Sequence, residues 1–223
     1  MDTTASAAGS FAASSSPGQM HFWQYRFRNE EDVLGKSFSV LSTDERERAN
    51  RLSRATARDR FILARGGLRC ILGPYLDADP RKLIFAYGEH GKPYLEGVDL
   101  SFNLSHSEEM AVYAVAKGGR VGVDVEFLGR RVSRDAVVQR FFAEEEASVL
   151  ASALEEEKDR LFFTIWTLKE AYLKARGEGI SVPLDSFAVE PGHPTASLLR
   201  AGGDTEVPLR WKLISVETER DYV

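Results

Sequence analysis

The chain has 223 residues, a hydrophobic content of 43% and a formal net charge of -5, which allows one large domain or two small ones with a real core. This charge argues against wholesale nucleic-acid binding, which favours a basic face. No apolar run approaches the roughly 20 residues that a membrane-spanning helix needs. A single cysteine, Cys70, excludes an intramolecular disulfide and a cysteine-based zinc site. We therefore expect a cytoplasmic protein, with Cys70 as buried filler rather than a catalytic thiol.

The N-terminal region changes character twice. Residues 1–19 are almost wholly Ala, Ser, Gly and Thr and predict a disordered tail. HFWQYRF, 21–27, alternates aromatic and polar residues and predicts the first strand, so the fold begins near Met20. From Ser42 the composition becomes helical and basic, with N-cap chemistry in Ser42 and Glu45. Eight arginines follow in 24 residues, either as a solvated helix surface or as ligands of a phosphate-rich molecule: Arg46, Arg48, Arg51, Arg54, Arg58, Arg60, Arg65 and Arg69.

The next stretch predicts a helix, short strands and a phosphate-binding loop. The helix over 58–72 is expected to end at Gly73-Pro74, and LIFAY, 83–87, is expected to be a short strand. In the loop GEHGKPYL the backbone around Lys92 fixes where its ammonium points.

SFNLSHS, 101–107, is expected to begin as a strand and to break at Asn103. The small hydroxyls around His106 are typical of phosphate binding, although a surface or capping role for this histidine is the simpler alternative. MAVYAVA, 110–116, predicts a strong strand, followed by a turn at residues 118–119.

VGVDVEF, 121–127, is one of the two stretches that organise the chain. Its period of two places the valines on one face and Gly122, Asp124 and Glu126 on the other, as expected for a strand. Hard oxygen ligands on a rigid strand suit Mg²⁺. The alternative is a pair of exposed structural acids, which is common in strands; Gly122 favours the metal site because it clears space beside the carboxylates.

The other organising stretch is FFTIWTLKEAYLKARG, 162–177, which predicts a helix with two buried faces. Glu170 and Lys174 share one face with two aromatic side chains, Phe163 and Trp166. The pair is either a solvated i,i+4 ion pair or part of a cleft floor, where partial desolvation strengthens its charges. Lys174 is expected to keep Glu170 ionised. The opposite face carries an apolar stripe: Leu161, Ile165, Leu168 and Tyr172.

The remaining segments predict short helices and then strands. Short helices are expected over 130–158, with the charge run EEEK solvated before the main helix. Strands are expected over 185–190, 196–200 and 207–216, and the final DYV reads as the start of another strand. The related openings DRFIL, 59–63, and DRLFF, 159–163, suggest two similar halves.

The expected fold is therefore α+β, with two similar halves arranged as a pseudo-dimer. Each half is a small, mainly antiparallel sheet packed on a long helix, and the site lies at the seam between them. We expect a tail over 1–19, an N-terminal half over 20–119 and a C-terminal half over 120–223, the last lacking its final strand.

Together, GKPYL, FNLSHS, VGVDVE and WTLKEAYLKARGEGIS resemble the successive signature motifs of the 4′-phosphopantetheinyl transferases of the surfactin-synthetase-activating type. The resemblance covers roughly residues 40–190. It implies a monomeric, Mg²⁺-dependent enzyme that transfers the phosphopantetheine arm of coenzyme A to a serine of an acyl or peptidyl carrier protein and releases 3′,5′-ADP.

The resemblance also implies roles for individual residues. Asp124, Glu126 and Glu170 would hold the metal. The residues themselves favour Glu170 as general base, directly or through a metal-bound water, because it alone comes from the helix opposite the pair of acids on the strand. Attack of a neutral serine on phosphorus also needs neutralised phosphate charge, which one Mg²⁺ and a few cations supply. Lys174 would complete the charge cradle. The residues implied to bind coenzyme A phosphates are Arg48, Arg60, Lys92, Ser105, His106, Lys169 and Lys174.

One departure concerns Glu45, which stands where relatives often have a basic residue, so that Arg48 would have to supply the phosphate contact.

Two other functions compete with transfer. An idle module that only binds coenzyme A or a carrier protein has no chemical reason to keep Asp124, Glu126, Glu170 and Lys174. An unrelated Mg²⁺-dependent phosphotransferase would usually show a phosphate loop such as GxxxxGK[ST], which the sequence lacks. The carrier is expected to serve fatty acid, polyketide or nonribosomal peptide synthesis.

Overall fold

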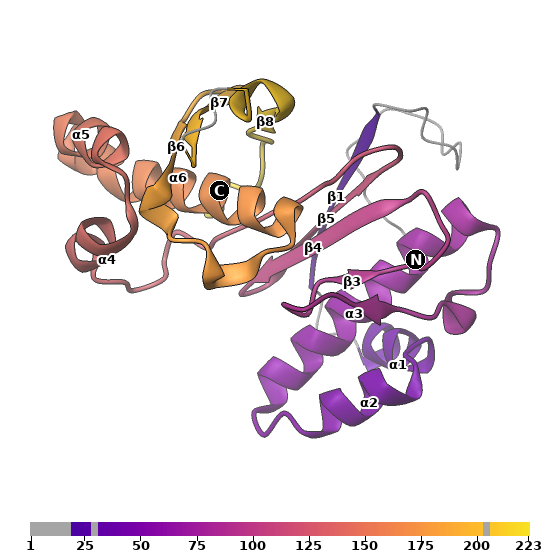
Figure 1. Cartoon of the computed structure of the whole chain (residues 1–223). Helices are drawn as coiled ribbons and strands as arrows, with labels where there is room; N and C mark the ends of the chain where they lie inside the picture. The colour runs from indigo at the N-terminus through magenta and orange to yellow at the C-terminus, as the bar shows by residue number, and fades with distance from the viewer. Residues whose placement is uncertain (1–18, 28–30, 203–205) are drawn as a thin grey trace. The chain divides into compact units, whose positions relative to one another are not determined.

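The computed structural model describes residues 19–27, 31–202 and 206–223. The chain divides into two compact units, Met1–Val121 and Gly122–Val223, and the boundary expected after residue 119 lies close to this division. Most of the expected 1–19 tail lies outside the described residues. The expected seam and pseudo-dimer stay predictions. Each unit contains a long helix and an antiparallel sheet of three strands (Figure 1), so the expected mixture of helices and antiparallel sheet is confirmed.

The N-terminal unit is built on a sheet with the strand order β1-β5-β4. Its long helix, α3, packs on this sheet through Leu63, Leu68 and Leu72, which share a buried cluster with Phe102 and Tyr113. The elements are β1 (Met20–Arg26), α1 (Glu31–Ser39), α2 (Thr43–Asn50), α3 (Ala55–Leu76), a 3₁₀ turn (Pro80–Lys82), β2 (Ala86–Tyr87), β3 (Pro93–Tyr94), β4 (Ser101–Ser107) and β5 (Met110–Ala116).

Two expectations for this unit are wrong. Helix α3 does not end at Gly73-Pro74 but runs to Leu76, with Asp77 in the left-handed conformation as its cap. Gly73 has no Cβ to clash with the proline ring, which relieves part of the restriction that a proline places on the residue before it. Strand β4 does not break at Asn103, because it pairs with β5 along its whole length. The strands expected over 21–27 and 110–116 are confirmed as β1 and β5, whereas the strand expected over 83–87 is only the two residues of β2.

The C-terminal unit packs its long helix, α6, against a sheet with the strand order β6-β7-β8. Ile165 and Tyr172 of α6 share a buried cluster with Phe187, Val189 and Leu198 of the sheet. The strand expected over 207–216 shrinks to β8, preceded by a 3₁₀ turn. The elements are α4 (Arg134–Phe141), α5 (Glu144–Ser152), α6 (Glu155–Arg176), 3₁₀ turns (Gly179–Ser181, Leu184–Ser186 and Pro208–Arg210), β6 (Phe187–Glu190), β7 (Thr195–Ala201) and β8 (Leu213–Ile214).

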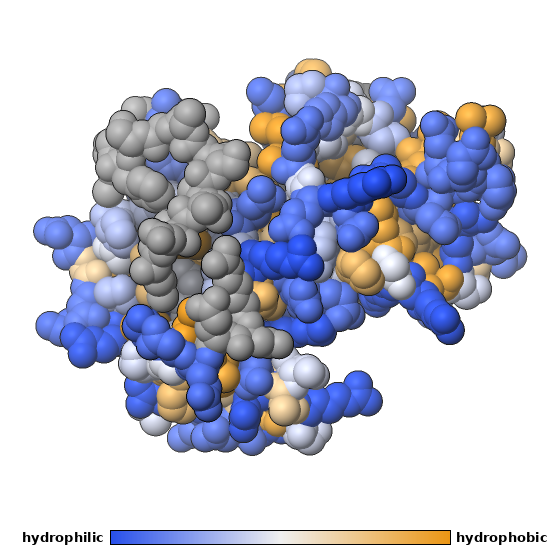
Figure 2. Space-filling view, turned by 180° about the vertical axis from the view of Figure 1, so that it is seen from behind, coloured by the Kyte–Doolittle hydropathy of each residue, from blue (hydrophilic) through white to orange (hydrophobic). Residues whose placement is uncertain are grey.

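Within the described residues, no helix combines the length and apolar character needed to cross a membrane. On the face drawn in Figure 2, hydrophilic residues cover most of the surface and hydrophobic ones show between them.

Candidate functional site

Helix α6 carries two of the predicted site residues and is longer than its sequence suggested. It begins at Glu155, not at residue 162, so the charge run EEEK forms its first turn. Three glutamates at this end stabilise it because the helix dipole favours negative charge there. The helix ends at Gly177, whose φ of 76° places it in the left-handed region that caps helices.

The two faces of α6 are not divided as predicted. Ile165, Leu168 and Tyr172 are buried as expected, but Phe163, placed on the charged face by the sequence pattern, is also buried in the core. Trp166 is half-buried, and its ring lies edge-on to that of Phe141. The aromatic residues beside the Glu170 face therefore belong mainly to the core.

The segment 121–127 is extended but forms no regular strand beyond a bridge between Phe127 and Tyr222. Its predicted alternation holds, because Val121, Val123 and Val125 are all buried. Its backbone comes very close to α6. A Cβ added to Gly122 would lie 2.1 Å from the carbonyl oxygen of Ala171 and 2.3 Å from the amide nitrogen of Ala175. Only glycine fits there, and this contact places the following carboxylates beside the helix.

Two cations hold the carboxylates of this segment. The Lys174 ammonium of α6 lies 2.6 Å from Asp124 Oδ1, and the Arg130 guanidinium lies 2.7 Å from Glu126 Oε1. The sequence analysis did not identify Arg130, because i,i+4 spacing predicts a pair only on a helix and residues 128–129 form a turn. Lys174 forms its ion pair with Asp124 and not with Glu170, so the predicted pair one turn apart on α6 is not the one formed.

Glu170 lies in the electrostatic field of the other two acids. Burial raises the pKa of its carboxyl group above the ordinary value, and the negative charge of Asp124 raises it further. The Lys174 ammonium partly opposes these effects, and Glu126 adds a smaller repulsion. Among the described residues, no hydrogen bond or ion pair reaches the Glu170 carboxylate. The structure thus places Asp124, Glu126 and Lys174 within electrostatic reach of Glu170, and their predicted roles in the site stay predictions.

This group of acids fits a divalent cation by its chemistry. Three carboxylates offer hard oxygen ligands, and a cation between them would relieve the repulsion that raises the pKa of Glu170. The three do not form a finished cage: the described part of the chain contains no group of three or more His, Cys, Asp or Glu side chains arranged to hold a metal. Mg²⁺ needs no such cage, because it keeps several waters and commonly uses only one or two carboxylates with substrate phosphates.

The C-terminal residues support the acidic segment from its other edge. Glu126 and Val223 exchange two backbone hydrogen bonds, of 2.8 and 3.1 Å, and the amide of Leu128 donates to the carbonyl of Asp221. Arg160 of α6 donates to the backbone carbonyls of Arg220 and Tyr222. The sequence interpretation missed this support because single-residue pairing leaves no periodic signal.

The N-terminal unit holds the other predicted phosphate ligands. Arg48 is exposed with its guanidinium over the ring of Phe61, and Arg60 forms an ion pair with the exposed Glu108. Lys92 donates to the carbonyl oxygen of Val121 at 2.9 Å. Burial lowers the pKa of the Lys92 ammonium to about 8, and the charge of Arg120 adds to this effect.

Ser105 and His106 are neighbours on β4 and therefore point to opposite faces. The serine is buried and the histidine exposed, and the His106 ring contacts that of Phe27. The predicted hydroxyl-imidazole cluster is thus split between two faces of one strand.

Part of the arginine cluster belongs to the core. Arg69, which is 1% exposed, lies 2.5 Å from the buried carboxylate of Glu45, and Arg65 lies 3.3 Å from the same group. Glu45 also accepts a hydrogen bond from the amide of Ser42, so the predicted N-cap is confirmed. These two arginines are not available to a ligand. Glu45 is therefore explained by its structural role, since it binds two buried arginines and caps α2.

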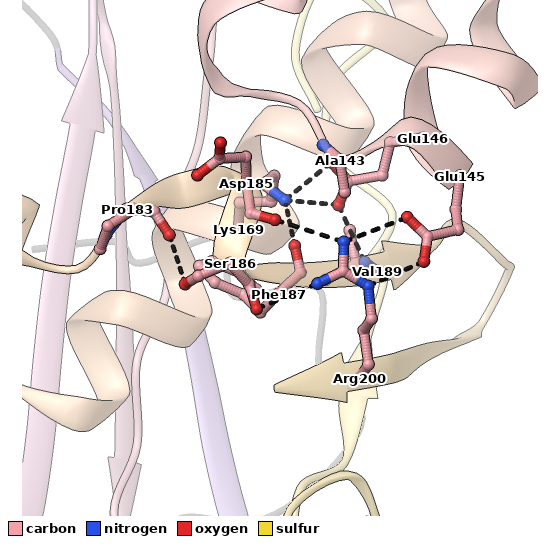
Figure 3. Close-up of polar contacts among 10 residues, drawn as sticks. All are labelled: Ala143, Glu145, Glu146, Lys169, Pro183, Asp185, Ser186, Phe187, Val189 and Arg200. Carbon is pink, nitrogen blue, oxygen red and sulfur yellow. Dashed lines mark hydrogen bonds and ion pairs between the residues drawn. The ribbon is translucent and has the colours of Figure 1, made fainter. Parts of the chain in front are cut away.

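Lys169 is placed where a phosphate cannot reach it. Its side chain is fully buried, with the ammonium 2.5 and 2.7 Å from the two oxygens of Glu146 (Figure 3). This geometry argues against the predicted contact of Lys169 with coenzyme A.

The chain is similar to proteins of one known family. Residues 120–223, which include Asp124, Glu126, Glu170 and Lys174, match the family profile described as the 4′-phosphopantetheinyl transferase superfamily. The 4′-phosphopantetheinyl transferase HetI of a Nostoc species is 40% identical over 167 residues, 73% of this chain and 70% of HetI. The chain belongs to the 4′-phosphopantetheinyl transferase family.

Two further relatives have the same name. A putative 4′-phosphopantetheinyl transferase of a Synechocystis species is 34% identical over 180 residues, 79% of this chain and 72% of the relative. The 4′-phosphopantetheinyl transferase Sfp of Bacillus subtilis is 30% identical over 152 residues, 68% of this chain and 66% of Sfp. The chain is thus an enzyme that transfers the 4′-phosphopantetheine arm of coenzyme A to a carrier protein.

Proposed function

We propose that this transferase is of the surfactin-synthetase-activating type and that Asp124, Glu126 and Glu170 hold the Mg²⁺ ion it uses. The observation that supports the assignment is that Glu170 lies in the field of two further carboxylates, Asp124 and Glu126. When bound, Mg²⁺ would neutralise charge on the pyrophosphate oxygens of coenzyme A. Lys174, which forms an ion pair with Asp124, supplies a second positive charge beside the proposed metal site.

Glu170 is the proposed general base. In the described part of the chain its carboxylate forms no ion pair, which leaves it to accept the proton from the carrier serine as the serine oxygen attacks phosphorus. Asp124 and Glu126 are poorer candidates, because each already forms an ion pair, Asp124 with Lys174 and Glu126 with Arg130. The proton passes to Glu170 directly or through one water. The products are the phosphopantetheinylated serine and 3′,5′-ADP.

The exposed cations of the N-terminal unit are the proposed ligands of the remaining coenzyme A phosphates. Arg48 and His106 are exposed, and the partner of Arg60, Glu108, is itself exposed and exchangeable. Lys92 carries a smaller positive charge near neutral pH than an ordinary lysine. Ser105 would act through its backbone or its buried hydroxyl. We further propose a monomeric, cytoplasmic enzyme.

The test is a panel of purified apo carrier proteins from fatty acid, polyketide and peptide synthesis, incubated with labelled coenzyme A. Label should enter at least one carrier in a Mg²⁺-dependent reaction with stoichiometric release of 3′,5′-ADP. The matched control is the same carrier with its acceptor serine changed to alanine, which should take up no label. Tight binding of coenzyme A without transfer to any carrier would instead support an idle binding module.

A further inference from the structure

A buried ion pair fixes helix α6 next to the proposed base. The Lys169 ammonium contacts both oxygens of Glu146 and donates to the backbone carbonyl of Phe187 at 2.9 Å (Figure 3). It therefore has an acceptor for each of its three N–H bonds. Burial lowers the pKa of Lys169, and the Glu146 carboxylate opposes that shift. With full hydrogen bonding, a charge in the core is held in one geometry.

Glu146 joins three elements through this pair. Besides the Lys169 ammonium, its side chain accepts the backbone amide of Ala143 at 2.8 Å and that of Val189 at 2.9 Å. These amides belong to the start of α5 and to β6, whereas Lys169 belongs to α6. Each carboxylate oxygen accepts two hydrogen bonds. The pair consequently fixes the position of α6 along its axis, and its rotation about that axis, relative to α5 and β6.

The N-terminal unit contains a matching pair. Glu45 is the third residue of α2, as Glu146 is of α5, and each accepts the backbone amide of the residue that precedes its helix. Arg69 is the fifteenth residue of α3 counted from Ala55, and Lys169 is the fifteenth of α6 counted from Glu155. Both cations also donate to backbone carbonyls of the chain that follows their helix.

The two pairs differ in what comes next on the helix. The residue after Arg69 is Cys70, whereas the residue after Lys169 is Glu170. Successive side chains of a helix point about 100° apart, so a cation fixed in the core sets the direction of the next side chain. On another side of α6, the backbone of Gly122 touches Ala171 and Ala175. Helix α6 is thereby held between its core anchor and the segment that carries Asp124.

We infer that Lys169 is a positioning residue for the transfer reaction, which acts by holding Glu170 in register with Asp124 and Glu126. The inference rests on the proposed roles of those three acids. On this inference Lys169 does not bind a phosphate of coenzyme A but affects the reacting groups indirectly. A rotation or slide of α6 would change the separation of the acids, and misplacement of about 1 Å can cost about a hundredfold in rate.

The test compares Lys169→Met and Glu146→Gln with the wild-type enzyme. Glu146→Gln nearly preserves the shape of the acid. It therefore still tests the ion pair if Lys169→Met does not fold. Circular dichroism and thermal melting give the folded fraction, and transfer kinetics are normalised to it. We expect kcat to fall about ten- to a hundredfold and the Mg²⁺ concentration for half-maximal rate to rise. Calorimetric affinity for coenzyme A without metal should stay within about twofold, because Lys169 does not touch the ligand.

The matched control is Arg69→Met, which removes the corresponding cation of the N-terminal unit. It should lower the melting temperature as Lys169→Met does, yet leave the Mg²⁺ dependence unchanged, because no carboxylate follows Arg69 on its helix. An unchanged kcat and Mg²⁺ dependence in folded Lys169→Met and Glu146→Gln would overturn the inference, as would an equal change in Arg69→Met. Lack of transfer by the wild-type enzyme on the whole carrier panel would overturn the proposed function instead.

Discussion

The Lys174 ammonium lies 2.6 Å from Asp124 Oδ1, and so joins the last turns of helix α6 to the extended segment that carries the acids. Asp124 is nearly buried, with its side chain 6% exposed, whereas the Lys174 side chain is 30% exposed. We propose that Lys174 would contact a phosphate of coenzyme A if Mg²⁺ held Asp124, because the lysine is the more exposed partner of this pair.

Replacement of Asp124 should remove most of the transfer activity. We expect Asp124→Ala to lower kcat by about a hundredfold or more, the scale of losing one key electrostatic group. Steady-state transfer from labelled coenzyme A measures the effect. Near-normal activity at saturating Mg²⁺ would refute the metal assignment.

Glu170→Gln should separate metal binding from proton transfer. The amide keeps the shape and one oxygen for the metal but cannot accept the serine proton, so we expect a large loss of kcat that excess Mg²⁺ restores only slightly. A Mg²⁺ titration of the rate measures this. Full recovery at high Mg²⁺ would show that Glu170 is a ligand only.

Gly122→Ala should strain the contact between the acidic segment and α6. Its new Cβ would meet backbone atoms of Ala171 and Ala175, which cannot rotate away. We expect the free energy of unfolding to fall by about 1–3 kcal/mol, as for other overpacked sites, together with a loss of activity. The matched control is Gly119→Ala, because a Cβ at Gly119 meets nothing within 4 Å. Equal effects of the two substitutions in denaturant melts would contradict the prediction.

The pH dependence should reveal Lys92. Because burial lowers its pKa from 10.5 to about 8, the folded protein binds fewer protons than the unfolded chain between these values. Stability should therefore rise with pH across this window relative to Lys92→Met. In the same range the ammonium loses its charge, so the KM for coenzyme A should rise above about pH 8. Lys92→Arg keeps the charge and should remove that rise. A rise of the same size in Lys92→Arg would assign the titration to another group.

Arg160 should matter for the metal although it is not one of the proposed ligands. It holds the carbonyls of Arg220 and Tyr222, next to the residue whose backbone pairs with Glu126. We expect Arg160→Met to raise the Mg²⁺ concentration for half-maximal rate several-fold. Arg210→Met is the control, since Arg210 forms an exposed pair with Glu206 and such pairs contribute little. A normal Mg²⁺ dependence in Arg160→Met would exclude the support role.

Several parts of the fold follow from local pattern. The alternation in 121–127 predicted the buried valines, and the motif order predicted the family, because periodicity and motif spacing are properties of neighbouring residues. The broken strand at Asn103 was wrong because tertiary pairing with β5 overrides the turn preference of small polar residues. The predicted helix end at Pro74 was wrong: α3 continues to Leu76, and Gly73, which lacks a Cβ, relieves part of the clash with the proline ring.

The sequence by itself determined the family and the candidate side chains for its chemistry, Asp124, Glu126, Glu170 and Lys174, because motifs are properties of neighbouring residues. Only the tertiary structure decided which charges face one another. It placed Lys174 on Asp124, Arg130 on Glu126 and Lys169 in the core on Glu146. The physical reason is that two lysines of one helix, Lys169 and Lys174, look alike in sequence, whereas the burial of each side chain depends on its direction relative to segments far along the chain.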